Sequence, residues 1–329
     1  MERKQMERKL EQIHLQITKN CNLRCYFCGQ WGKKGFFSDA SGEEMNLKDW
    51  EKVIFDIVRY REKTGISPFV MIWGGEPLVS PYFEPIVKLL HMYGFKVGIV
   101  TNGVLINRYQ EIINEAVQKV YVSLDGMSEL HDSARGKGVF EKTVKNIENL
   151  IKPDITVMSV VTKKLLHEFY DFLNFLNSTN IKELYFQDMI GLTTEEVENY
   201  KKMLEEEFGI RPEYIDAWEN NECLQFHEEL DDLLNRIDRS FYHYEIHYKK
   251  HDASENRYCL SPFRHVHVTW NGNVTYCTDF YDFTAGNVKE ERLEKIFVNE
   301  MSEKYRTVIM TGKSIICRHC SWKGNTVYS

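Results

Sequence analysis

Three cysteines lie close together near the start of the sequence, in the stretch CNLRCYFC. Cys21, Cys25 and Cys28 follow one another at spacings of four and three residues, so one loop can direct three thiolates at one point. Structural zinc sites and most iron–sulfur clusters close with four ligands, but the next cysteine is Cys223. A three-thiolate loop suits a cubane cluster in which one iron keeps an open position for a ligand. The alternatives are a chance group of cysteines and a zinc knuckle.

The stretch CNLRCYFC resembles the signature of the radical S-adenosylmethionine (SAM) superfamily, CxxxCxφC, in which φ is aromatic. Phe27 occupies the aromatic position. The resemblance implies that the open iron binds the amino and carboxylate groups of SAM. It also implies that an electron from the cluster cleaves SAM to a 5′-deoxyadenosyl radical, which removes a hydrogen atom from an unactivated carbon. Because such a cofactor carries the difficult chemistry, the protein has to position it and exclude water and oxygen.

A second motif follows a predicted strand. Phe69–Trp73 is a continuous apolar run, typical of a buried parallel strand, and it ends in Gly74, Gly75, Glu76 and Pro77. Glycines let the backbone approach a ligand closely, and a glutamate can accept a charge-assisted hydrogen bond from an ammonium group. The family resemblance assigns this GGEP motif to the amino group of SAM, whereas alone it could be a plain turn.

Two further strand ends carry candidate SAM contacts. Ser123 lies in SLDG at the end of the predicted strand Val120–Leu124, and Arg135 follows it. A serine and an arginine suit a carboxylate or a ribose. The resemblance to family members with C-terminal extensions assigns both to the SAM carboxylate, and it places Asn102 of the TNG motif at the SAM site. The other reading of Ser123 and Arg135 is a helix cap and a surface arginine.

The strands that carry these motifs alternate with helical segments. The first predicted strand, His14–Thr18, leads into the cysteine loop, and the sixth is Glu183–Phe186. This alternation predicts an α/β fold, a partial (β/α)6 parallel barrel whose functional loops share one end. We predict that residues 1–190 form this barrel and that residues 191–258 form an acidic helical connector.

The sequence changes again from residue 259. Arg264–Trp270 and Asn273–Tyr276 are β-rich and are separated by Asn-Gly, which predicts a β-hairpin, and a helix follows near Leu293–Val308. We predict that residues 259–329 form a small domain, a β-hairpin plus a helix, that binds a cluster.

Four cysteines of this last segment form a second set of candidate ligands. Cys259, Gly272 and Cys277 match C-x(9–15)-G-x(4)-C, the opening of the SPASM extension of radical SAM enzymes, and only Cys317 and Cys320 follow. This shorter pattern resembles the twitch domain. The resemblance implies one auxiliary [4Fe–4S] cluster, closed by four thiolates and suited to electron transfer. Structural zinc is the alternative, because a hairpin with a CxxC also suits a zinc ribbon.

The composition of the chain limits the classes of binding partner that we expect. The net charge is −7 and no long basic block occurs, so we expect no nucleic acid, and no apolar run approaches the roughly 20 residues of a membrane span. The N-terminal stretch MERKQMERKLEQ lacks a signal-peptide core, so we expect a cytoplasmic protein whose eight cysteines are reduced metal ligands. We expect a small-molecule substrate or a precursor peptide, and an external one-electron donor or acceptor such as a flavodoxin or ferredoxin.

The leading functional hypothesis is dehydrogenation of a secondary alcohol in a sugar or aminocyclitol, because the cysteine pattern resembles a twitch dehydrogenase of aminoglycoside biosynthesis. Asp188, which follows the sixth strand, is the candidate base. The first alternative is a radical epimerase in which Cys223 donates the hydrogen atom. Another is a peptide maturase that forms thioether or carbon–carbon crosslinks; against it, a first strand at His14 leaves no room for a preceding peptide-recognition domain of about 80 residues. An iron–sulfur scaffold or sensor is the non-enzymatic alternative.

The two cysteine sets predict the metal content. If both hold [4Fe–4S] clusters, anaerobically prepared protein should contain about eight irons per chain. Replacing Cys21, Cys25 and Cys28 together with Ala should leave about four irons and abolish SAM cleavage. Replacing Cys317 and Cys320 should also leave about four irons but allow uncoupled SAM cleavage. Iron and zinc analysis checks this, and about four irons plus one zinc in the intact protein would contradict it.

Overall fold

The structure is a computed structural model that describes residues 7–32, 34–37, 43–221, 223, 226–248, 259–314, 316, 317 and 320. The first six residues of the charged N-terminal stretch lie outside the described residues, as do the two residues between the last pair of cysteines. All of the cysteines are described, so both candidate ligand sets can be located.

Ten strands form one sheet within the described residues, in the order β10-β9-β8-β1-β2-β3-β4-β5-β6-β7. Every neighbouring pair from β8 to β7 is parallel, and the pairs β8–β9 and β9–β10 are antiparallel. The predicted partial parallel barrel with a C-terminal hairpin is therefore confirmed. The strands are β1 (Gln12–Gln16), β2 (Phe69–Trp73), β3 (Val97–Thr101), β4 (Lys119–Ser123), β5 (Asp154–Val160), β6 (Glu183–Gln187), β7 (Glu245–Tyr248), β8 (His265–Val268), β9 (Asn273–Thr275) and β10 (Gly286–Asn287).

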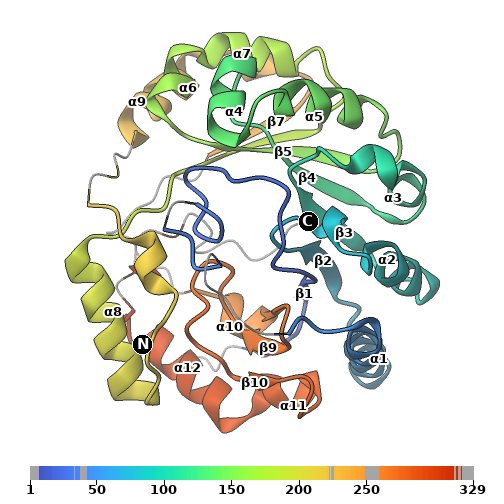
Figure 1. The fold of residues 1–329 in the computed structure, drawn as a ribbon, viewed down its shortest axis with the longest axis vertical. Helices are drawn as coiled ribbons and strands as arrows, with labels where there is room; N and C mark the ends of the chain where they lie inside the picture. Colours follow the sequence, from blue (N-terminus) through green and yellow to red (C-terminus); the bar gives the residue numbers. More distant parts are fainter. Residues whose placement is uncertain are drawn as a thin grey trace.

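Helices cover the outer side of the curved sheet, as Figure 1 shows for α1, α2, α3 and α5 around β1 to β5. None of the helices in the described part of the chain is long and apolar enough to cross a bilayer. The helices are α1 (Leu47–Thr64), α2 (Phe83–Met92), α3 (Gln110–Ala116), α4 (Ser128–Arg135), α5 (Val139–Glu148), α6 (Lys163–His167), α7 (Phe169–Leu176), α8 (Thr194–Phe208), α9 (His227–Arg236), α10 (Ser261–Arg264), α11 (Leu293–Val298) and α12 (Glu300–Met310), with the short 3₁₀ helices η1 (Pro77–Val79), η2 (Ile106–Arg108), η3 (Ile215–Trp218) and η4 (Arg239–Phe241).

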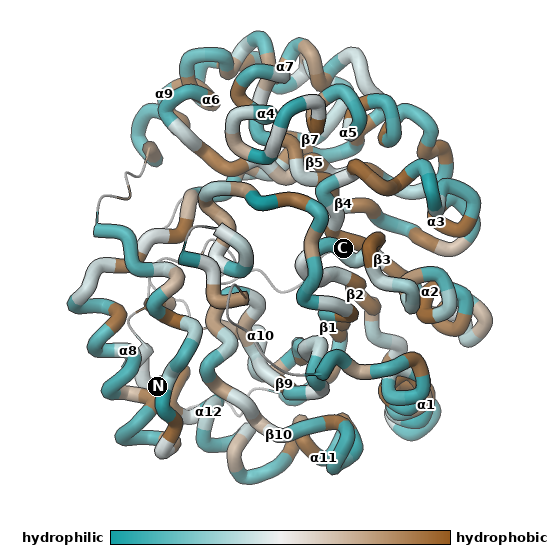
Figure 2. Tube along the Cα trace, viewed as in Figure 1, coloured by the Kyte–Doolittle hydropathy of each residue, from teal (hydrophilic) through white to brown (hydrophobic). Residues whose placement is uncertain are grey.

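The alternation of side chains in β1 explains why the barrel has an apolar outside layer and a polar interior. Ile13 and Leu15 are fully buried in the core between the sheet and the helices. Gln12, His14 and Gln16 point to the opposite face and are also buried. In Figure 2 the helices around the sheet, for instance α1, carry many hydrophilic residues, and hydrophobic residues occur along the strands. The interior of the barrel can therefore present polar groups to a ligand.

The sheet continues through the boundaries predicted at residues 190 and 259. β7, which lies in the predicted helical connector and was not predicted as a strand, pairs with β6. β8, the first strand of the predicted cluster domain, pairs with β1 with His14 opposite His267. The segment that carries the C-terminal cysteines is thus attached directly to the strand that leads into the first cysteine loop.

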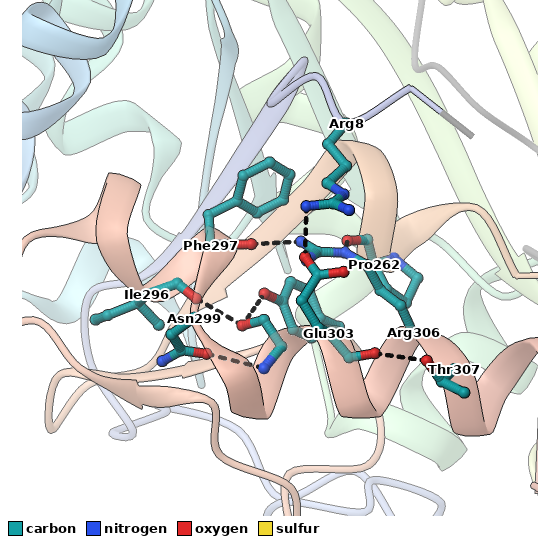
Figure 3. Close-up of polar contacts among 10 residues, drawn as sticks. Arg8, Pro262, Ile296, Phe297, Asn299, Glu303, Arg306 and Thr307 are labelled. Carbon is teal, nitrogen blue, oxygen red and sulfur yellow. Dashed lines mark hydrogen bonds and ion pairs between the residues drawn. The ribbon is translucent and has the colours of Figure 1, made fainter. Parts of the chain in front are cut away.

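A buried arginine holds the C-terminal helices together. The Arg306 side chain is 3% exposed and donates hydrogen bonds to the carbonyl oxygens of Pro262, at 2.7 Å, and Phe297, at 2.5 Å. Glu303 accepts from Arg306 at 2.7 Å and from Arg8 at 2.8 Å, as Figure 3 shows. Pro262 lies in α10, shortly after Cys259 in the chain. The network therefore fixes the chain close to Cys259, the first cysteine of the second set.

We expect the substitution Arg306→Met to lower the free energy of unfolding by about 3 kcal/mol, because two buried carbonyl oxygens would lose charged donors. The matched control Lys304→Ala changes an exposed residue of the same helix and should cost less than about 0.5 kcal/mol. Urea denaturation followed by circular dichroism measures both. Equal stability of the two variants would show that the buried network contributes nothing.

Candidate active site at the mouth of the barrel

The first cysteine loop supplies hydrogen-bond donors to its own sulfur atoms. The backbone N–H of Leu23 donates to Cys21 Sγ, and that of Trp31 donates to Cys28 Sγ, each at 3.4 Å. Such donors stabilise sulfur in its anionic, metal-bound form. Burial raises the pKa of the Cys21 thiol to about 12, and a bound metal ion would favour the thiolate there.

Cys25 receives its donor from a different element. Nη1 of the Arg135 guanidinium lies 3.9 Å from Cys25 Sγ. Nε of the same guanidinium forms an ion pair with Asp125 Oδ2 at 2.5 Å. Asp125 also accepts the backbone N–H of Val160 at 3.0 Å. Arg135 has a side chain only 10% exposed, so the alternative reading as a surface arginine is wrong. Asp125, inside the SLDG motif, was not singled out from the sequence.

The GGEP motif packs directly on the segment that precedes the cysteine loop. The N–H groups of Gly75 and Glu76 donate to the carbonyl oxygens of Thr18, at 3.0 Å, and Asn20, at 2.8 Å. A Cβ atom at Gly74 would lie 2.4 Å from the Thr18 oxygen, which is too close for any other residue type. The glycines are therefore required by this backbone contact.

The Glu76 carboxylate joins two of the predicted SAM loops. It accepts hydrogen bonds from Leu78 N at 3.1 Å, Thr101 Oγ1 at 2.8 Å and Asn102 N at 2.7 Å. Burial raises the pKa of the Glu76 carboxyl to about 7, against the opposing effect of these three donors. In this structure Glu76 thus connects the end of β2 with the end of β3.

All of the predicted SAM contacts surround one cavity of about 290 Å³. The same cavity is lined by the three cysteines of the first loop and by Asp188, while Cys223 is not among its lining residues. The arrangement fits a cluster with an open iron and SAM beside it, although the role of each side chain stays a prediction. The predicted SAM contacts in the lining are Phe27, Gly74, Gly75, Glu76, Asn102, Ser123 and Arg135.

The second cysteine set lines another cavity, of about 340 Å³, with Cys259, Cys277, Cys317 and Cys320 in its wall. The cluster that these four cysteines are predicted to hold, and its zinc alternative, stay predictions. Among the described residues, a separate group of possible metal ligands is Glu183, Glu245 and His247 on β6 and β7.

The two cavities share a wall. Thr278, Asp279 and Cys320 line both of them. The backbone oxygen of Asp279 accepts from Trp218 Nε1 at 3.0 Å, and the Trp218 ring fills the space beside Gly29 in the first cysteine loop. Burial raises the pKa of the Asp279 carboxyl to about 6. Sequence reasoning missed Asp279, for which proximity to Cys277 was the available signal.

Asp188 lies in a small polar group rather than alone. Tyr248 donates its hydroxyl to Asp188 Oδ1 at 3.2 Å, and His227 Nδ1 lies 3.2 Å from Asp188 Oδ2. Burial raises the pKa of the Asp188 carboxyl, opposed by the charge of His227 and the hydrogen bond from Tyr248. Asp188 is among the residues that line the SAM cavity, whereas its partner Tyr248 lines the second cavity.

Cys223 lies behind the cavity wall. Its sulfur donates to the carbonyl oxygen of Met189 at 3.5 Å, and a Cβ atom at Gly191 would lie 2.2 Å from Cys223. Met189 lines the SAM cavity, whereas Cys223 does not. The role of Cys223 as hydrogen-atom donor stays a prediction.

Two family models match the chain. The model described as the radical SAM superfamily matches residues 15–176, and the SPASM model, described as an iron–sulfur cluster-binding domain, matches residues 259–321. The two matches contain the first and the second cysteine set, respectively.

Curated relatives cover the chain to different extents. A probable GTP 3′,8-cyclase of Archaeoglobus fulgidus is 28% identical over 54% of this chain, and the match spans 59% of that protein's length. An Fe-coproporphyrin III synthase of Methanosarcina barkeri is 23% identical over 93% of this chain and 79% of its own length. The names of these two relatives give different activities, although both match the chain in sequence.

Solved structures show a similar fold over nearly the whole chain. SuiB of Streptococcus suis, bound to S-adenosylmethionine, superposes with a TM-score of 0.68 at 15% identity, covering 91% of this chain and 68% of that chain. BtrN in complex with AdoMet and 2-DOIA gives a TM-score of 0.51 at 16% identity, covering 98% of this chain and 95% of that chain. At these identities the similarity is one of fold.

The buried ion pair in the cavity wall predicts a double-mutant result. Asp125→Ala should lower the free energy of unfolding by about 3 kcal/mol, because the Arg135 charge would stay buried without a partner. Adding Arg135→Met should recover at least about 1 kcal/mol of this loss. Thermal or urea unfolding of the single and double variants measures the difference. A double variant that is less stable than Asp125→Ala would contradict the expectation.

Proposed function

Because the chain belongs to the radical SAM superfamily and carries a C-terminal SPASM iron–sulfur domain, we propose that it is an oxidoreductase that dehydrogenates a polyhydroxylated small molecule. A sugar or an aminocyclitol is the proposed substrate class. The observation that supports the proposal is the wall shared by the two cavities, one lined by the four C-terminal cysteines and the other by the predicted SAM contacts.

The chemistry of dehydrogenation explains why this arrangement is useful. When bound, SAM and its cluster supply a 5′-deoxyadenosyl radical that takes a hydrogen atom from a carbinol carbon. The remaining substrate radical becomes a carbonyl compound only if it also loses its hydroxyl proton and one electron. The residues Cys259, Cys277, Cys317 and Cys320 would hold the electron acceptor, which we propose is a second [4Fe–4S] cluster.

The proposed proton acceptor is Asp188. Asp188 lines the SAM cavity, and burial raises the pKa of its carboxyl, which favours uptake of a proton by this group. Tyr248 and His227 hold the carboxyl by hydrogen bonding and charge. An external one-electron partner such as a flavodoxin or ferredoxin is part of the proposal, because the electron for SAM cleavage has to come from outside the chain.

The comparison with BtrN supports the small-molecule class. BtrN was solved in complex with AdoMet and 2-DOIA, and the match covers 98% of this chain and 95% of that chain. The second candidate function is maturation of a peptide. It is favoured by the similarity to SuiB, which has the higher TM-score and was also solved with the precursor peptide SuiA. Epimerisation through Cys223 is the third candidate.

Anaerobic turnover with a panel of sugars, aminocyclitols and short peptides tests the proposal. We expect a product two mass units lighter than a sugar or an aminocyclitol, with one 5′-deoxyadenosine formed per product. Asp188→Asn should keep SAM cleavage but lower the product formed per 5′-deoxyadenosine by about a hundredfold. The control Asp171→Asn, at an exposed position of α7, should behave as the unchanged protein.

Other products would replace the proposal with one of its alternatives. A redox-neutral product that contains solvent deuterium would indicate an epimerase, provided that the Cys223→Ala variant no longer incorporates deuterium. A crosslinked peptide would indicate a maturase. Normal coupling in Asp188→Asn would remove Asp188 as the proton acceptor while leaving dehydrogenation intact.

A further inference from the structure

One carboxylate, that of Glu44, holds the segment immediately ahead of the first cysteine loop. Thr18 Oγ1 donates to Glu44 Oε1 at 2.9 Å, Lys19 N donates at 2.7 Å, and Asn20 Nδ2 donates at 3.3 Å. Asn20 N also donates to Thr18 Oγ1 at 3.0 Å. A side chain from beyond the cysteine loop thus fixes three consecutive residues at the exit of β1.

The same three residues form the support for the SAM side of the cavity. Their opposite side accepts the N–H groups of Gly75 and Glu76. A Cβ atom at Gly75 would lie 2.4 Å from both the Asn20 and Lys19 carbonyl oxygens, so the two segments are in direct backbone contact. Because there is no space between them, a shift of residues 18–20 would displace the two cavity-lining residues Gly75 and Glu76.

The residue after Glu44 is tied to the C-terminal part of the chain. Met45 N donates to the carbonyl oxygen of Trp270 at 2.7 Å, and the Met45 side chain is buried. Trp270 follows β8, at the start of the hairpin that leads to Cys277. Glu44 is therefore held between the first cysteine loop and the hairpin of the SPASM domain rather than on a free loop.

We propose that Glu44 is a positioning residue for SAM. Its carboxylate fixes residues 18–20 so that Gly75 and Glu76 keep the geometry that SAM binding requires. An oxygen acceptor at this position suits the task because donors from all three residues converge on Oε1 of Glu44. The proposal rests on the use of SAM, which the family shares, and is independent of the substrate and of dehydrogenation.

Equilibrium binding of SAM to anaerobically reconstituted protein, with no substrate present, tests the role. Glu44→Ala should bind SAM about tenfold more weakly at unchanged iron content, because the donors on residues 18–20 lose their acceptor. Hydrogen exchange of the Lys19 amide should become faster in the same variant. Glu44→Gln keeps one acceptor oxygen and should bind SAM within about twofold of the unchanged protein.

The neighbouring residue provides the matched control. Glu43 is exposed, and Glu43→Ala should change neither SAM affinity nor the exchange of Lys19. If Glu44→Ala does not retain iron, Glu44→Asp serves as the test variant instead. The aspartate carboxylate is one methylene too short to reach Lys19 N, so this variant should also bind SAM about tenfold more weakly. Normal SAM affinity in an iron-replete Ala or Asp variant overturns the proposal. Equal losses in Glu44→Gln and Glu44→Ala also overturn it, because the retained acceptor would then have no effect.

Discussion

The whole site depends on the backbone contact between the exit of β1 and the exit of β2. Two hydrogen bonds join Gly75 and Glu76 to the carbonyl oxygens of Thr18 and Asn20. A Cβ atom at Gly74 or Gly75 would lie 2.4 Å from a carbonyl oxygen of residues 18–20, so glycine at these two positions allows the close approach between the cysteine loop and the GGEP motif. Parallel pairing of β1 and β2, with Gln16 opposite Trp73, brings the two exits to the same edge. The position of the cluster and the position of its ligand are thus determined by one contact.

β1 also links the two cysteine sets, because it pairs with a strand on each of its two sides. Its other neighbour is β8, so the hairpin with the C-terminal cysteines is built onto the same strand that leads to the first cysteine loop. The inward residues of the two strands include His14, His265 and His267, and all three line the second cavity. Burial and the neighbouring imidazoles lower the pKa of His14, and burial lowers that of His267 to about 3. Burial therefore disfavours the charged forms of His14 and His267 in this polar part of the barrel interior.

The parts of the fold that follow from periodicity could be predicted from the sequence, whereas isolated polar contacts could not. β2 was predicted with its observed bounds because FVMIW is a continuous apolar run between polar segments. β7 was missed because EIHY is short and lies in an acidic, helical stretch. Cys21 and Cys277 were found through their spacing, but Glu44 has no spacing signal, since its partners lie more than twenty residues away along the chain. Side chains that position a site through tertiary hydrogen bonds become visible only once the fold brings them together.

The shared wall between the two cavities follows from chain connectivity. Cys277 lies two residues after the end of β9, so the chain that leaves this strand must pass between the second cysteine set and the barrel mouth. Thr278 and Asp279 occupy that passage and line both cavities. Trp218 then joins the passage to the first cysteine loop, with its ring beside Gly29 and its Nε1 bonded to Asp279. Among the described residues, Cys320 also lines both cavities, so the second cysteine set lies next to the cavity that the predicted SAM contacts surround.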